Sequence, residues 1–169
     1  MTVQQELDVR DARDDDVRGF IDCYKKTWES LRGILPDEYV EEVIEETGQP
    51  ELADRIRAGI ADPERVILVA EEGGEIVGLA QGRANRGGYS WLGFMGVSPE
   101  NRRRGVGRGL LNEFIRISKQ RECTKVSLDT APCLKPAIKL YTEMGFIPEG
   151  YMRNHMHGLD LIFYSLFLE

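Results

Sequence analysis

Apolar side chains in the first third of the chain follow the spacing of amphipathic helices. A short alternating segment, Glu6–Arg10, predicts a first strand, and the acidic run after it supplies caps and N-terminal acids for a helix. The expected buried stripe of that helix has helical period and consists of Val17, Phe20, Ile21, Tyr24, Trp28 and Leu31. A second helix is predicted after Pro36, and a short third one is predicted to close before Pro63. Their inward-facing residues are Tyr39, Val40, Val43 and Ile44 in the second helix, and Leu52, Ile56 and Ile60 in the third.

From residue 65 onward the pattern changes to that of strands. Arg65–Glu72 and Glu75–Arg83 flank Gly73-Gly74, which is typical of a two-residue hairpin. The remaining predicted elements are a strand over Tyr89–Val97, a helix that begins near Arg104–Gly107, a strand over Lys125–Thr130, a helix from Pro136 to Gly145, and a closing hairpin of Phe146–Met156 and Leu161–Leu168. Strands mixed with helices in this order predict an α/β fold in which helices flank a mixed sheet.

Length and composition fit one soluble domain. The chain has 169 residues, of which 41% are hydrophobic and 30% charged. Its longest apolar run, Val66–Ala70, is far too short to span a membrane. The N-terminus shows no secretory signal, and Cys23, Cys123 and Cys133 match no zinc pattern, so we expect a cytoplasmic protein. Cys123 and Cys133 are interpreted as buried thiols.

The charge is unevenly distributed. The first 64 residues carry 18 acidic and 8 basic residues, a net charge of −10, whereas the remainder carries 11 acidic and 14 basic residues, a net charge of +3. Two interpretations stay open: a solvated acidic helical surface, or a cationic ligand near the first part and an anionic ligand held by the second. A chain of net charge −7 argues against nucleic acid as a partner.

The segment from Met95 to Ile115 has the pattern of a phosphate site. It leads from a strand through a loop into a helix start that is rich in glycine and arginine. Gly105 and Gly107 would let an anion approach the free N–H groups at the positive end of the helix. The segment lacks the Lys-Ser/Thr of a P-loop and the G-x-G-x-x-G of a dinucleotide fold. A glycine-rich helix start with solvated arginines is the alternative.

Two motifs resemble those of a known family. Arg102–Gly107 fits the (Gln/Arg)-x-x-Gly-x-(Gly/Ala) motif of the GCN5-related N-acetyltransferases (GNAT), and Ala137–Phe146 resembles their Ala-x-x-Leu-Tyr-x-x-x-Gly-Phe segment. The order of predicted elements agrees over nearly the whole chain. The resemblance implies a twisted, mostly antiparallel sheet of about seven strands. It also implies one acetyltransferase domain over residues 1–169, with acceptor-side helices in residues 1–64 and the acetyl-CoA-binding core in residues 65–169.

The resemblance also assigns residues to acetyl-CoA. Backbone amides from Arg103 to Arg108 would hold the pyrophosphate. The strand edge at Met95 and Val97 would pair with the pantetheine arm, and a backbone N–H in the gap between this strand and the next would polarise the thioester carbonyl. The predicted cofactor-binding residues are therefore Met95, Gly96, Val97, Arg102, Arg103, Arg104, Gly105, Val106, Gly107 and Arg108. Leu134 stands where the family often has an asparagine that contacts CoA.

The catalytic residues are less clearly marked. The resemblance implies that Tyr141 is the general acid for the departing thiolate, although its position also suits a core tyrosine. Proton transfer from a phenol of pKa about 10 to a thiolate of pKa about 8.5 is uphill by roughly 2 kcal/mol. Gly93 occupies the position of the family's usual glutamate base. Asp129 and Glu29 are the possible substitutes, but Asp129 could equally cap a turn and Glu29 could simply be exposed.

The predicted function is transfer of an acetyl group from acetyl-CoA to a primary amine by direct attack, with a small amine, a lysine side chain or a protein N-terminus as acceptor. The alternative is a non-catalytic acyl-CoA sensor, and acylation of a hydroxyl or use of a longer acyl chain is a weaker possibility. We expect no membrane partner and a possible homodimer. We also expect no metal, because His155 and His157 lack a third ligand in the sequence. The acceptor pocket is expected near Trp28, Leu31, Ile34, Leu35 and Tyr39.

Overall fold

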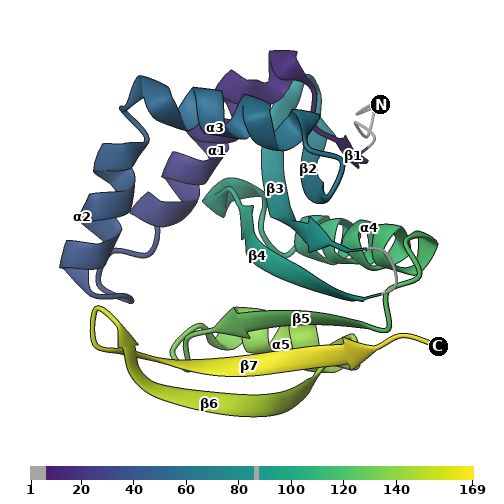
Figure 1. Ribbon diagram of the computed structural model, residues 1–169. Helices are drawn as coiled ribbons and strands as arrows, with labels where there is room; N and C mark the ends of the chain where they lie inside the picture. Colours follow the sequence, from purple (N-terminus) through teal and green to yellow (C-terminus); the bar gives the residue numbers. More distant parts are fainter. Residues whose placement is uncertain (1–6, 86–87) are drawn as a thin grey trace, which may run out of the picture.

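One seven-stranded sheet organises the molecule (Figure 1). The computed structural model describes residues 7–85 and 88–169. The strands lie in the order β1-β2-β3-β4-β5-β7-β6; β4 and β5 run parallel, and the other neighbouring pairs run antiparallel. Their bounds are β1 Asp8–Asp11, β2 Arg65–Glu72, β3 Glu75–Ala84, β4 Tyr89–Val97, β5 Lys125–Thr130, β6 Ile147–Met156 and β7 Leu159–Phe167. The prediction of a mixed, mostly antiparallel sheet is confirmed.

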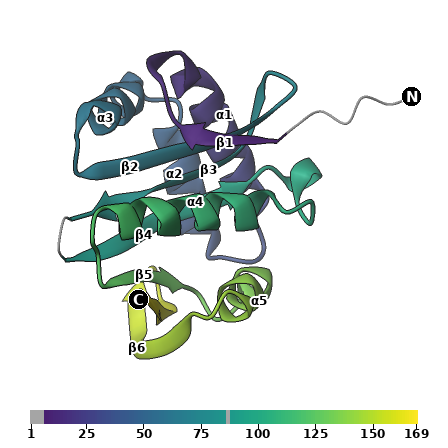
Figure 2. The same cartoon turned by 90° about the vertical axis from the view of Figure 1, so that its right-hand side faces the viewer.

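Five α-helices in the described residues cover this sheet. They are α1 Val17–Glu29, α2 Asp37–Glu46, α3 Pro50–Ala61, α4 Val106–Gln120 and α5 Lys135–Glu143. Two consecutive residues of β2, whose side chains point to opposite faces of the sheet, show which helices pack on each face. Leu68 packs in a cluster with residues of α4 and α5, whereas Val69 packs with residues of α1 and α3. Figure 2 looks onto α4, with β5, α5 and β6 below it. None of the helices in the described part of the chain has the length and apolar character needed to cross a membrane.

The predicted elements differ from the structure mainly at their ends. Strand β1 begins at Asp8, and the predicted start at Glu6 lies outside the described residues. Helix α1 ends at Glu29, so Leu31 falls in the following turn, where its N–H donates to the Trp28 carbonyl. Helix α3 extends over 12 residues because Pro50 starts it at the first helical position, where proline is favoured. The prediction of a buried Cys133 is wrong, because this thiol is exposed.

The centre of the sheet contains two irregularities that shape the site. A β-bulge interrupts the pairing of β3 with β4 where Gln81 pairs with Phe94 and Gly82 with Leu92, so Gly93 is the extra residue. On its other edge, β4 pairs with β5 only as far as Leu92↔Leu128. Strand β5 continues to Thr130 along β7. The two central strands therefore separate beyond Leu92.

A small cluster closes one end of this gap. Trp28 of α1 packs with Val40 and Val43 of α2 and with Ala131, which follows β5. Leu134 packs against the same cluster, so its side chain serves the core at the position where the family often has asparagine. Helices α1 and α2 thereby pack against the end of β5.

Candidate active site

The gap between β4 and β5 exposes an edge of β4 with free peptide groups. The Ser98 N–H donates to the Val77 carbonyl at 2.9 Å, which makes this a hydrogen-bonded pair of the β3–β4 ladder. Because such pairs alternate along antiparallel strands, Gly96 also turns its peptide groups toward β3, and Met95 and Val97 turn theirs toward the gap. One of these groups already has a partner, because the Arg102 Nε donates a hydrogen bond to the Val97 carbonyl at 3.1 Å.

The peptide groups of Met95 are thus placed as expected for pairing with an extended ligand. Gly96 has a different observed role, because a Cβ at this position would lie 2.7 Å from the Thr27 side chain of α1. Its predicted contact with the cofactor stays a prediction.

A run of unbonded amides follows this edge at the start of α4. Within the described part of the chain, the backbone N–H groups from Arg103 to Arg108 donate to no other group, whereas the Gly109 N–H donates to the Gly105 carbonyl at 2.9 Å. Gly105 has φ +86°, and a Cβ there would meet nothing within 4 Å. Free amides at the positive end of a 15-residue helix, with open space beside them, fit a phosphate group.

The arginine side chains around these amides are mostly engaged. Arg104 forms an ion pair with Glu72 at 2.6 Å and Arg108 with Glu143 at 2.9 Å. Arg102 donates to Ser30 Oγ at 2.6 Å besides Val97. The attraction for an anion therefore comes mainly from the amides and from Arg103, whose side chain forms no ion pair among the described residues.

Tyr141 lies in the core next to the gap. Its side chain is 7% exposed, its ring packs near Phe146 and Tyr164, and its hydroxyl forms no hydrogen bond within the described residues. Burial, together with the negative charge of Asp129, raises the pKa of Tyr141 to about 12. The phenol therefore keeps its proton at any physiological pH.

Asp129 lies where the charges of several elements meet. It is half-buried near the end of β5, and burial raises the pKa of its carboxyl group, an effect that the nearby His155 partly offsets. The Asp129 carboxylate also contributes to the raised pKa values of Tyr39 in α2 and Tyr141 in α5. Asp129 is therefore near enough to both tyrosines for its charge to affect their pKa values. Tyr141 packs with the cluster on the α4 face of the sheet, whereas Asp129 pairs with Phe163 on the opposite face, and the catalytic roles of both residues stay predictions.

Glu29, the other predicted substitute base, is placed differently. Glu29 is half-buried at the last position of α1, and its negative charge contributes to the raised pKa of Arg32. None of the contacts within the described residues links it to Asp129 or Tyr141. Asp129 is therefore the better-placed carboxylate, and the role of Glu29 stays an untested prediction.

Aromatic side chains form one wall beside Asp129. Trp28 stacks on Phe94 and meets Tyr39 edge-on, with centroid distances of 5.9 and 5.0 Å. Tyr39 in turn stacks on His157 at 4.6 Å, and His157 Nε2 lies 3.1 Å from Glu42. This contact joins α2 to the β6–β7 turn. Trp28 and Tyr39 were expected near an acceptor, but the partnership with His157 was not, because no local signal predicts contact between residues so far apart in the sequence.

His155 is near enough to Asp129 for its charge to lower the pKa of that carboxyl group, and it lies within an irregular part of β6. Between the pairs Met152↔Leu161 and Met156↔Leu159, the ladder is interrupted. Asp160 stabilises this distortion by accepting from the Asn154 N–H at 2.8 Å and from the Tyr151 hydroxyl at 2.5 Å. Residues 7–85 and 88–169 contain no group of three or more His, Cys, Asp or Glu side chains that could hold a metal ion.

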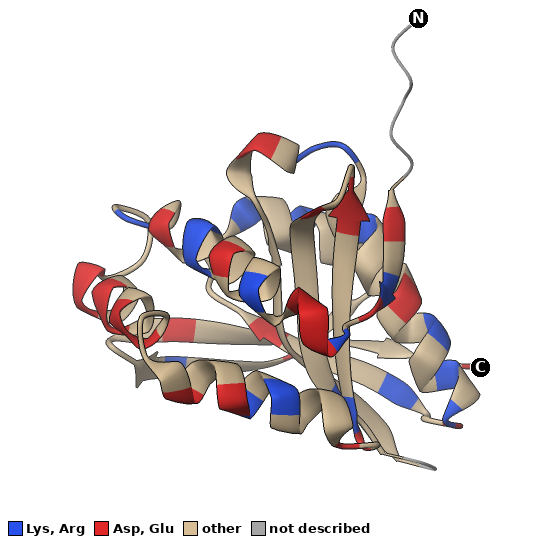
Figure 3. Cartoon of the chain, turned by 90° about the horizontal axis from the view of Figure 1, so that it is seen from above, with Lys and Arg blue, Asp and Glu red and all other residues tan. Residues whose placement is uncertain are grey.

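The acidic surface lies beside this wall. Figure 3 shows acidic residues along α2, which carries Asp37, Glu38, Glu41, Glu42, Glu45 and Glu46. The free amides at the start of α4 and the acidic α2 lie on opposite faces of the sheet, with α4 in front of it and α2 behind it in Figure 2, an arrangement that suits an anionic ligand on one face and a cationic ligand on the other.

Comparison with known proteins agrees with this geometry. The family model described as "Acetyltransferase (GNAT) family" matches residues 20–146. N-alpha-acetyltransferase 30 from Xenopus laevis is 31% identical over 84 residues; the match covers 49% of this chain and 30% of that relative, so the chain spans less than a third of its length.

Solved structures show the same fold. The PaiA N-acetyltransferase from Thermoplasma acidophilum, solved in complex with coenzyme A, superimposes with a TM-score of 0.78 at 18% identity, covering 95% of this chain and 99% of that one. The ribosomal-protein-S18-alanine N-acetyltransferase from Escherichia coli gives a TM-score of 0.74 at 17% identity, covering 97% and 95%. The family match over residues 20–146, joined to this fold and to the amides at the start of α4, shows that the chain belongs to the GNAT acetyltransferase family.

Proposed function

We propose that this protein transfers an acetyl group from acetyl-CoA to a primary amine that attacks directly. The observation that carries the proposal is the pair of free backbone sites in one segment, the β4 edge at Met95 and the unbonded amides of Arg103–Arg108. When bound, acetyl-CoA supplies an acetyl group activated as a thioester. The free amides would hold its diphosphate, and the Met95 peptide groups would pair with its pantetheine arm.

Asp129 is proposed as the group that deprotonates the amine. An alkylamine of pKa about 10.4 is almost entirely protonated at pH 7, and its deprotonation costs about 4.6 kcal/mol. A carboxylate with a raised pKa is a stronger base than an ordinary one, and Asp129 has such a pKa because it is half-buried. Its position also compensates for Gly93, which provides no base in β4.

Tyr141 is proposed to donate to the departing sulfur. Because the pKa of this phenol is about 12, full proton transfer to a thiolate of pKa about 8.5 is uphill by roughly 5 kcal/mol. Tyr141 therefore contributes mainly as a hydrogen-bond donor at its Oη, with the proton moving late. Its effect on the rate should be moderate.

The acceptor is proposed to be cationic before it reacts. The acidic α2, Asp129 and the aromatic side chains of Trp28 and Tyr39 together favour an ammonium group with an apolar portion. Small amines, lysine side chains and protein N-termini share this chemistry. The relatives named above as acetyltransferases of α-amino groups and of a ribosomal-protein alanine favour the N-terminus among them.

A thiol-release assay tests the proposal. The protein is supplied with acetyl-CoA and a panel of alkylamines, aminoglycosides and peptides with free N-termini. Release of free thiol that depends on an amine is the expected result. If CoA raises the melting temperature but no amine promotes thiol release, the protein is instead a non-catalytic acyl-CoA sensor, the alternative that Gly93 motivates.

A further inference from the structure

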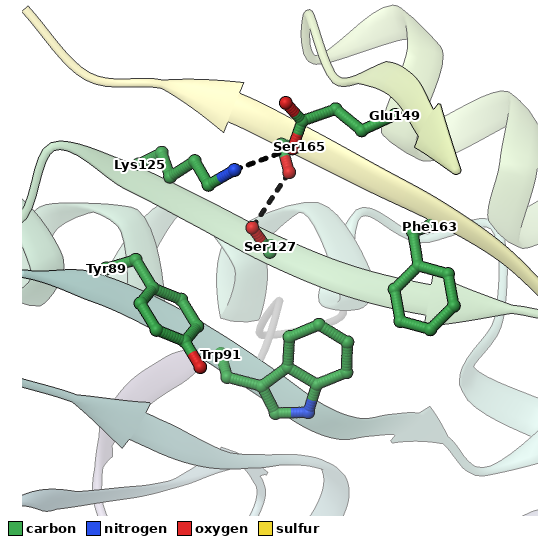
Figure 4. Close-up of a pocket in the computed structure, with 7 residues that line it drawn as sticks. All are labelled: Tyr89, Trp91, Lys125, Ser127, Glu149, Phe163 and Ser165. Atoms are coloured by element: carbon green, nitrogen blue, oxygen red, sulfur yellow. Dashed lines mark hydrogen bonds and ion pairs between the residues drawn. The ribbon is translucent and has the colours of Figure 1, made fainter.

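A pocket of about 310 Å³ opens on the sheet face of β4, β5, β7 and β6 (Figure 4). We call it the sheet-face pocket. It is lined by Tyr89, Trp91, Lys125, Ser127, Glu149, Phe163 and Ser165. Each of these residues belongs to a strand, and none to a helix. Neither the family motifs nor the catalytic argument uses this pocket.

The register of the sheet connects the pocket to Asp129. Asp129 of β5 pairs directly with Phe163 of β7. Residues directly opposite in an antiparallel pair point to the same face, with Cβ atoms about 4.5–5.5 Å apart. Ser127, two residues before Asp129 on β5, also points to this face and lines the pocket. The pocket therefore begins beside the proposed base.

Aromatic rings form its walls. The rings of Trp91 and Phe163 are 5.8 Å apart and tilted by 40°, and Figure 4 shows both side chains, which belong to β4 and β7, the strands on either side of β5. Gly93 adjoins this wall, since a Cβ there would make ordinary contacts with the Gln81 carbonyl oxygen at 3.6 Å and with the Trp91 indole at 3.8–3.9 Å. A flat apolar group of a ligand whose amine is at Asp129 can contact both rings.

Four polar side chains of the pocket pair with one another. Ser127 and Ser165, which form its buried floor, hydrogen bond at 2.8 Å. Lys125 Nζ lies 2.7 Å from Glu149 at the far end. These charges offset each other, so the pocket presents apolar walls and no net charge to a ligand, in contrast to the acidic α2.

We propose that the sheet-face pocket binds an aromatic or large aliphatic group next to the reacting amine and so determines acceptor preference. This inference rests on the proposed function and specifies its substrate class: a primary amine that carries a flat apolar group. Such a group could belong to a small arylalkylamine or to the first side chain of a polypeptide.

Paired acceptors test the proposal. We compare kcat/KM for 2-phenylethylamine with that for ethylamine, and for a short peptide beginning with Phe with one beginning with Gly. The wild type should prefer the aromatic member of at least one pair by tenfold or more, which is in the range that apolar pockets provide. Preference within the amine pair identifies a small molecule, and preference within the peptide pair alone identifies an N-terminus.

Variants localise the preference. Trp91→Ala and Phe163→Ala should each reduce the ratio about tenfold, mainly through KM, whereas Trp91→Phe should retain most of it because a flat ring remains. Met152→Ala is the matched control, since Met152 is a 40%-exposed apolar residue of β6 outside the pocket, and it should leave the ratio unchanged. Melting curves exclude variants that fail to fold.

The possible failures are distinguishable. If all amines react but no aromatic member is preferred, or if Trp91→Ala, Phe163→Ala and Trp91→Phe all keep the wild-type ratio, the pocket proposal is overturned and the acetyl-transfer proposal survives. If the wild type releases no thiol with any amine, both proposals are overturned together.

Discussion

The proposed coenzyme side and the proposed acceptor side of the gap are built in different ways. The coenzyme side consists of peptide groups from one continuous segment, Met95–Arg108, and depends on backbone conformation at Gly105. The acceptor side consists of side chains from α1, α2, β4, β5, β6 and β7, which the sheet register brings together. A backbone site tolerates changes of side chain and is easily recognised as a motif. A site of scattered side chains can change its preference while the fold and the coenzyme site stay the same.

On the acceptor side, Asp129→Asn should cause the largest decrease in the rate of acetyl transfer. Loss of a general base typically lowers turnover by about 10²–10⁴-fold. Steady-state thiol release measures this loss. The increase in melting temperature caused by CoA should remain, because no part of the amide site is altered. Retention of wild-type turnover would show that another group, Glu29 included, deprotonates the amine.

On the coenzyme side, Gly105→Val should instead remove the binding of CoA. A β-branched residue at φ +86° costs about 1–2 kcal/mol of stability and shifts the neighbouring amides. CoA should then no longer raise the melting temperature at concentrations that stabilise the wild type. Gly74→Val is the matched control, because Gly74 has φ +85° and equally open surroundings in the β2–β3 hairpin. It should cause similar strain but preserve the response to CoA; an undiminished response in Gly105→Val would place the diphosphate elsewhere.

Tyr141→Phe should have a smaller effect, a loss of about tenfold in kcat. The hydroxyl makes no hydrogen bond among the described residues, and the phenol is a weak acid, so its removal costs one donor to the sulfur. The free energy of unfolding, measured by denaturant titration, should change by less than about 1 kcal/mol. Activity reduced to background with CoA binding intact would contradict this view and make the proton transfer obligatory.

The pH dependence of kcat sharpens the assignment of the base. Because the pKa of Asp129 is raised, kcat should fall as the pH is lowered through that pKa, at a pH above the normal range for aspartate. Tyr141, with a pKa of about 12, should cause no alkaline decrease up to about pH 11. Measurement of kcat against pH for the wild type and for Asp129→Asn, with one amine, checks both the acidic decrease and the absence of an alkaline decrease. If the acidic decrease is the same in the variant, it belongs to another group.

The smallest expected effect concerns stability. A carboxyl group whose pKa is raised on folding binds protons more tightly in the folded state, so it costs stability as the pH rises from about 3.8 through the folded pKa. At pH 7, Asp129→Asn should therefore raise the melting temperature by at most a few degrees. The difference should vanish below pH 3.8, where both forms are uncharged. An equal or lower melting temperature at pH 7 would indicate that the carboxylate is stabilised by contacts that the asparagine loses.

Local patterns were sufficient for much of the fold. The predicted strands at residues 65–72, 89–97 and 125–130 coincide with β2, β4 and β5. Strands β2 and β5 are mostly buried runs, and β4 mixes buried and exposed positions. The coenzyme side was predicted for the same reason, because its glycines and the helix start lie in one segment. The family assignment from these motifs is confirmed. The residues assigned to acetyl-CoA, the possible homodimer and the cytoplasmic location stay predictions.

The acceptor side was largely hidden from the sequence because it depends on long-range register. Asp129 was recognised as a possible base, but its neighbour Phe163 lies in another strand, and only the pairing of β5 with β7 places them together. His155 and His157 were interpreted as half of a metal site or as surface residues. Their proximity to Asp129 and Tyr39 results from the distortion of β6 and the position of α2, neither of which has a local sequence signal.

The single inserted residue in β4, Gly93, changes which face of the sheet the side chains before and after it point to. In a regular strand, positions four apart face the same way. Here Trp91 lines the sheet-face pocket, whereas Met95 packs on the opposite side with the cluster beneath α4. One strand can consequently offer an indole to one substrate and, a few residues later, a bare edge to the other. Deletion of Gly93 would let the β3–β4 ladder continue without the bulge, with Leu92 and Phe94 as successive partners of Gly82 and Gln81, and Trp91 and Met95 would keep their opposite faces.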